Sequence, residues 1–183
     1  MPAVFDKLGV HFDYPDNWQI EDYDEGLDSE VVQVVVTSPQ SAFWHLCKHP
    51  LDVDLDTLFD QGLAAMRIQY PDMEVEIAAD LTSAGGWMEE QLVKNEQHVS
   101  DELGRGSAAG TKEEINRIYG YNVNFICLDL TITAWLRGIR TPSASYLLLC
   151  QAEDREMLEM GAVFRAMWIS LLRNEQKICD EQE

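Results

Sequence analysis

The sequence predicts an α+β fold in which a mainly antiparallel sheet packs against helices. Runs of alternating or β-branched residues, which are typical of strands, occur in two groups along the chain. Each group is followed by an apolar stripe at helical spacing. Because the strands come in groups and do not alternate one by one with helices, antiparallel pairing is expected.

The N-terminal part of the chain predicts the first strands. Apolar residues alternate with polar ones before a turn that contains proline, which is the pattern of a half-buried strand. A later run of valines predicts a strand that is covered on both faces. The strands expected here are residues 10–14, a strand that begins at Trp18, residues 31–36 and residues 42–48.

The first helix is predicted over Asp54–Tyr70. Asp54 is a suitable N-cap, because its carboxylate can accept a hydrogen bond from a backbone N–H of the first turn. The helix should end before Pro71, since the residue that precedes a proline disfavours the helical region. A short strand with one wet face is expected around residues 75–77. The apolar stripe of the helix consists of Leu55, Leu58, Phe59, Leu63 and Met66.

Residues 83–110 differ in composition from the rest of the chain. Five of the eleven glycines fall in this segment. The apolar residues between the two glycine groups keep a weak helical repeat. We therefore expect an inserted helix, loosely docked, and then a flexible linker over Gly104–Gly110.

Two further strands are predicted after the insertion. Residues 121–137 contain neither proline nor glycine. This pattern predicts one long strand with a bulge or bend inside it. A turn around Pro142 then leads to a strand over residues 145–151. The residues of the long strand that are expected to face the core are Ile126, Leu128, Leu130, Ile132, Ala134 and Leu136.

The last helix is predicted to start near Asp154 and to pack an apolar stripe on the sheet. Its methionines can also serve an adaptable binding face, although a stripe of this width usually belongs to the core. A polar tail is expected over residues 174–183. The stripe consists of Met157, Met160, Phe164, Met167 and Leu171.

Length and charge bound the classes of function. A chain of 183 residues predicts a single domain, residues 1–183. The formal net charge is −20, and residues 1–60 hold 13 acidic and only two basic residues. Such a field repels phosphates, so nucleic acids and anionic membranes are not expected as partners. The acid excess indicates either a basic protein partner or simply a well-solvated surface.

Localisation and cysteine usage agree with an intracellular domain. No apolar run approaches the roughly 20 residues that span a bilayer, and no signal peptide is visible, so a cytoplasmic protein is expected. The C-x-x-C spacing of many zinc and redox sites is absent. Free thiols are therefore expected at Cys47, Cys127, Cys150 and Cys179.

The N-terminal pattern F-x-x-x-G-x-x-F-x-Y-P-x-x-W is formed by Phe5, Gly9, Phe12, Tyr14, Pro15 and Trp18. Together with the order of the predicted elements, it resembles the PsbP-like superfamily over the whole chain except residues 83–110. That superfamily includes an extrinsic protein of the photosynthetic oxygen-evolving complex, a nuclear import factor that binds the Ran GTPase, and bacterial proteins without assigned function. The resemblance implies an α/β/α sandwich around an antiparallel sheet of about six or seven strands. It also implies protein binding without catalysis.

One strand carries candidate metal ligands. His45, Cys47 and His49 alternate, so their side chains point to one face of a strand. Imidazole and thiolate suit zinc or copper. The two histidines are roughly 13 Å apart at Cα, which is too far to share one ion unless the strand bends. Two neighbouring ligands with an acid such as Asp52 form an alternative set.

A second group of candidates lies on the long strand. It could line a polar cavity for a small ligand, or its members could instead satisfy one another under a helix or at a sheet edge. The group consists of Asp129, Thr131, Thr133, Arg137 and Arg140.

Catalytic motifs are absent from the sequence. There is no Gly-x-Ser-x-Gly, and Gly104-Arg105-Gly106 lacks the third glycine of a dinucleotide loop. We therefore expect a non-enzymatic protein-binding domain without a cofactor, whose contact surfaces are the acidic N-terminal third and the insertion. The alternative is a domain that binds a small molecule or a metal through one of the two candidate groups.

Overall fold

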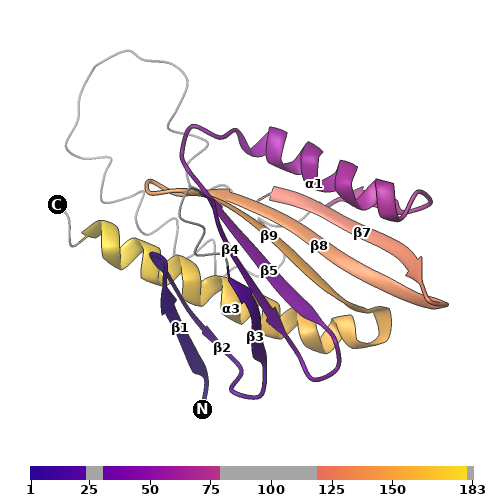
Figure 1. The fold of residues 1–183 in the computed structure, drawn as a ribbon, viewed down its shortest axis with the longest axis horizontal. Coiled ribbons are helices and arrows are strands. Elements are labelled where there is room, and N and C mark those ends of the chain that lie inside the picture. Colours follow the sequence, from indigo (N-terminus) through magenta and orange to yellow (C-terminus); the bar gives the residue numbers. More distant parts are fainter. Residues whose placement is uncertain (24–30, 79–118, 181–183) are drawn as a thin grey trace.

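The computed structural model describes residues 1–23, 31–78 and 119–180 (Figure 1). The strands are β1 (Ala3–Lys7), β2 (Val10–Tyr14), β3 (Gln19–Tyr23), β4 (Val32–Thr37), β5 (Phe43–His49), β6 (Glu74–Ile77), β7 (Tyr119–Cys127), β8 (Leu130–Arg140) and β9 (Ser145–Glu153), and the helices are α1 (Leu55–Gln69) and α3 (Asp154–Asp180). Within the described residues, seven strands form one sheet in the order β3-β4-β5-β9-β8-β7-β6, and every neighbouring pair is antiparallel. The predicted α+β fold with an antiparallel sheet and helices is confirmed.

The strands β1 and β2 form a separate hairpin that packs against α3. The sequence prediction missed β1. Leu8 and Gly9 connect the two strands with φ values of 57° and 67°, as a two-residue type I′ turn requires. Phe12 of β2 is fully buried, and its ring centroid lies 4.7 Å from that of Trp44 on β5. The hairpin therefore shares the core of the main sheet.

Helix α1 agrees with the prediction at both ends. The Asp54 carboxylate accepts a hydrogen bond from the Thr57 N–H at 3.0 Å, and the helix stops before Pro71. Phe59 on α1 packs closely over Gly138 of β8. A β-carbon at Gly138 would lie 2.7 Å from the Phe59 ring, so this approach of helix and strand requires glycine.

The predicted long strand over residues 121–137 is wrong, because the chain reverses inside it. Leu128 and Asp129 have φ values of 49° and 63° and connect β7 to β8 as a two-residue turn. Phe125 pairs with Ile132 across this turn. Odd-numbered residues of β7 therefore face the same side of the sheet as even-numbered residues of β8.

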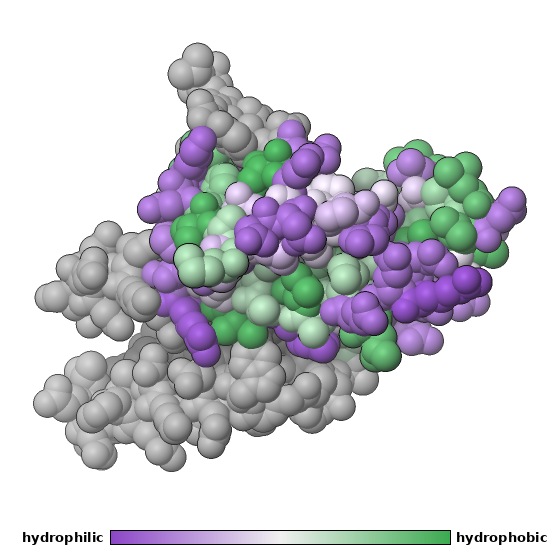
Figure 2. Space-filling model, turned by 90° about the horizontal axis from the view of Figure 1, so that it is seen from below, coloured by the Kyte–Doolittle hydropathy of each residue, from purple (hydrophilic) through white to green (hydrophobic). Residues whose placement is uncertain are grey.

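The reversal explains which predicted core residues are wrong. Ile132, Ala134 and Leu136 are buried, whereas Ile126, Leu128 and Leu130 are 73%, 91% and 46% exposed. Figure 2 shows hydrophobic residues at the end of the molecule that the β7–β8 hairpin forms.

Helix α3 begins at Asp154, as predicted, and continues to Asp180. The first seven residues of the expected polar tail are therefore helical. Glu175 is only 5% exposed and accepts a hydrogen bond from the Ser143 hydroxyl in the β8–β9 turn. The predicted insertion over residues 83–110 lies outside the described residues.

The two helices contact alternate residues of the central strands. On β9, Leu147 and Leu149 pack in the apolar cluster that contains Leu55, Leu58 and Phe59 of α1. Tyr146, Leu148 and Cys150 belong instead to the larger cluster that contains the apolar residues of α3. The same alternation separates Leu136 from Trp135 on β8. In the part of the chain that the structure describes, no helix combines the length and the apolar character needed to cross a membrane.

Candidate functional site

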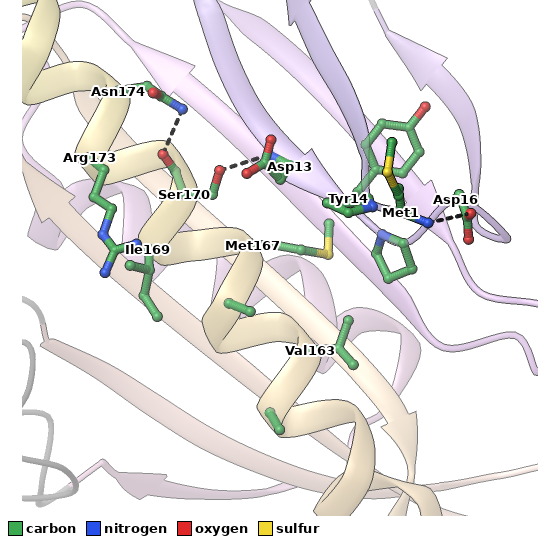
Figure 3. Close-up of a pocket in the computed structure, with 14 residues that line it drawn as sticks. Met1, Asp13, Tyr14, Asp16, Val163, Met167, Ile169, Ser170, Arg173 and Asn174 are labelled. Carbon is green, nitrogen blue, oxygen red and sulfur yellow. Dashed lines mark hydrogen bonds and ion pairs between the residues drawn. The ribbon is translucent and has the colours of Figure 1, made fainter.

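An open groove of about 970 Å³ lies between the β1–β2 hairpin and α3 (Figure 3). One wall is formed by Met1 and Pro2, which precede β1, and by residues 13–16 at the end of β2 and in the turn after it. The other wall is one face of α3 over about three turns. The walls are largely apolar. They include Pro2, Tyr14, Ala162, Val163, Ala166 and Ile169.

Small side chains on α3 leave the space for the groove. Ala162 and Ala166 are both exposed and lie one helical turn apart, so they share one side of the helix. Hydrogen bonds hold the hairpin beside them: the Asp13 N–H donates to Ser170 Oγ at 2.8 Å, and the Asn174 amide donates to the His11 carbonyl at 3.4 Å. Two hydrogen bonds therefore join the hairpin to α3 beside the groove.

Charged groups lie at the edges of the groove. Asp13 and Asp16 are exposed on the hairpin side, and Arg173 is exposed on α3. Asp16 also forms an ion pair of 3.1 Å with the Met1 amino group. An apolar middle with charged edges is suited to binding and orienting a chain segment.

Two of the three predicted metal ligands come together. His45 Nε2 lies 3.4 Å from Cys47 Sγ and 3.2 Å from Oε1 of Gln33, which the sequence prediction did not include. His49 lies instead at the end of β5, opposite Ser145. Burial raises the pKa of the Cys47 thiol to about 11, so this thiol is protonated at neutral pH. Among the described residues, no three or more His, Cys, Asp or Glu side chains gather as a metal site.

Arg137 is the central member of the second candidate group. Its guanidinium donates to the carbonyls of Tyr121 and Leu136 and to the Asn122 amide oxygen. Burial lowers its pKa to about 10, so the group remains charged at neutral pH. Its Cζ lies 5.3 Å from the centre of the Trp135 ring, within the range of a cation–π contact. These contacts satisfy the buried cation without a carboxylate.

The other members of that group do not form one cavity with Arg137. Asp129 is exposed in the β7–β8 turn, whereas Arg137 is buried, so these two members lie in different environments. Thr131 is exposed, and the Thr133 hydroxyl lies 2.8 Å from Asp154 Oδ1. Arg140 donates to the Leu51 carbonyl on the α1 side of the sheet. The structure therefore spreads these side chains over separate environments.

Comparisons with protein-family models, with curated proteins and with solved structures find no match in any of the three. The function is accordingly inferred from the groove, the surface charge and the contacts of the candidate residues.

Proposed function

We propose that this chain is a non-enzymatic protein-binding domain that takes a segment of a basic partner protein into the groove between α3 and the β1–β2 hairpin. The groove itself carries the proposal. Its volume of about 970 Å³ is at the upper end of the range for small-ligand pockets, roughly 300–1,000 Å³. A groove of this size that is open along a helix suits an extended or helical chain segment better than a small molecule.

The fold proposed for this function is an α/β/α sandwich of the PsbP-like kind. The alternate contacts of α1 and α3 on β9 support it, because successive strand residues point to opposite faces of a sheet. Proteins of that superfamily act mostly by binding other proteins. The resemblance and the groove therefore agree on the same class of function.

The charge of the protein supports a basic partner. The net charge is −20, and the hairpin belongs to residues 1–60, which hold 13 acidic and two basic residues. A field of this sign accelerates the approach of a basic protein, and the acceleration falls as salt screens it. Apolar contacts in the groove then slow dissociation. Salt is therefore expected to act on the association rate, and groove substitutions on the dissociation rate.

A peptide library displayed on phage tests the proposal directly. The library is selected on the wild-type protein and screened against Ala166→Trp, which fills the groove from an exposed helix position. Ala65→Trp is the matched control, because Ala65 is an exposed alanine on α1, away from the groove. Selected peptides are then made, and their rate constants are measured at low and high salt.

We expect basic peptides with an apolar anchor that bind the wild type and Ala65→Trp equally. Ala166→Trp should weaken them at least about tenfold, mainly through faster dissociation. Peptides that bind Ala166→Trp as well as the wild type, or a selection without any basic peptide, would overturn the proposal.

A further inference from the structure

We propose that Gln33, His45 and Cys47 form a zinc-binding site on the face of β4 and β5 that points away from α3. Gln33 and Cys47 are direct partners across the two strands. His45 lies two residues before Cys47 on β5, so its side chain points to the same face. An amide oxygen, an imidazole and a thiol therefore lie on the same face of the β4–β5 pair, at two cross-strand positions.

The distances between the donor atoms match those between ligands of one tetrahedral ion. With Zn–S near 2.3 Å and Zn–N near 2.0–2.1 Å, a tetrahedral angle separates sulfur and nitrogen by about 3.5 Å. Cys47 Sγ and His45 Nε2 are hydrogen-bonded at 3.4 Å, a separation that two ligands of one ion could keep. The same construction with an oxygen ligand gives about 3.4 Å between nitrogen and oxygen. His45 Nε2 and Gln33 Oε1 are 3.2 Å apart.

The ligand chemistry is compatible with zinc. Thiolate and imidazole are the usual ligands of zinc, and an oxygen ligand is compatible with them. Gln33 is exposed, so the remaining position of the ion is open to water.

The site departs from the trio expected from the sequence. His49 lies opposite Ser145, two rungs from the Gln33–Cys47 pair. Gln33, from the neighbouring strand β4, is the third proposed ligand instead of His49. Binding replaces the Cys47 thiol proton by the metal, because the thiolate is the form that coordinates zinc.

The test titrates the full chain, reduced and treated with a chelator, with zinc chloride in a calorimeter. A parallel titration with cobalt(II) chloride is followed by absorption, since a cobalt–thiolate bond gives a charge-transfer band in the near ultraviolet. The variants are Cys47→Ser, His45→Gln and Gln33→Glu. His49→Gln and Cys127→Ser are the controls, because they remove an imidazole and a thiol outside the proposed site. Circular dichroism verifies that each variant is folded.

One zinc ion per chain is expected to bind the wild type and both controls with similar affinity. Cys47→Ser should remove the cobalt–thiolate band and weaken zinc binding by more than about 100-fold, and His45→Gln should weaken it similarly. Gln33→Glu should tighten binding, since a carboxylate is a stronger zinc ligand than an amide oxygen. The proposal is overturned if the wild type binds no zinc, if Cys47→Ser keeps the affinity, or if Cys127→Ser or His49→Gln loses it.

Discussion

The β7–β8 turn offers a direct test of the backbone conformation. Leu128 and Asp129 both have positive φ, 49° and 63°, in a two-residue turn that normally takes Asn-Gly. A residue with a β-carbon in this region costs roughly 1–2 kcal/mol, and less for Asp or Asn. Leu128 is 91% exposed, so its replacement sacrifices little packing. The double variant Leu128→Asn/Asp129→Gly should therefore be more stable than the wild type.

The expected gain is about 1–2 kcal/mol, after allowance for the larger entropy that glycine gives the unfolded chain. In a protein of this size, that corresponds to a rise in melting temperature of roughly 2–8 °C. Urea unfolding and thermal melts measure it. Leu128→Ala is the control, because it removes the exposed side chain and keeps the β-carbon at the same φ. Equal stabilisation by Leu128→Ala, or destabilisation by the double variant, would refute the assigned turn.

Three further substitutions test packing and buried polar groups through urea unfolding. Gly138→Ala should destabilise the fold by about 1–3 kcal/mol, because its β-carbon would lie 2.7 Å from the Phe59 ring; an unchanged midpoint would contradict the close contact of α1 and β8. Arg137→Lys should cost about 1–3 kcal/mol, because an ammonium cannot reproduce the planar set of bonds to two carbonyls and an amide, whereas Arg67→Lys at an exposed position on α1 should be neutral. Ser143→Ala should also cost about 1–3 kcal/mol, since it leaves the buried Glu175 carboxylate without its hydroxyl donor; no loss of stability would show that water replaces this donor.

The fold could be predicted where the sequence carries a strong period. The stripes of α1 and α3, and the N-cap at Asp54, belong to this class. The β7–β8 turn could not be found in this way, because Leu128 and Asp129 lack the glycine or asparagine that usually marks such a turn. Apolar residues continue through the turn, and alternation alone cannot distinguish one long strand from two strands that reverse.

The candidate sites show a similar division. The alternation along β5 was sufficient to place His45 and Cys47 on one face, and the structure brings their donor atoms within 3.4 Å. Gln33 depends on the register between β4 and β5, which a single sequence does not specify. The groove depends on the docking of β2 and the turn after it against α3, a contact between parts of the chain that lie far apart in the sequence. Contacts between elements that are distant in the sequence therefore limited the prediction of both sites.

The register of β5 links both proposed sites to the core. Trp44 and Leu46 are buried in the cluster that α3 and the β1–β2 hairpin share, whereas the alternate residues His45 and Cys47 are only half-buried. A slip of one residue would expose the Trp44 ring and bury the His45 imidazole in its place. Loss of an aromatic side chain from a core costs about 3–5 kcal/mol, which is a large part of the 5–15 kcal/mol stability of a typical domain. The burial of Trp44 therefore holds Cys47 opposite Gln33, and it also holds the core on which the groove is built.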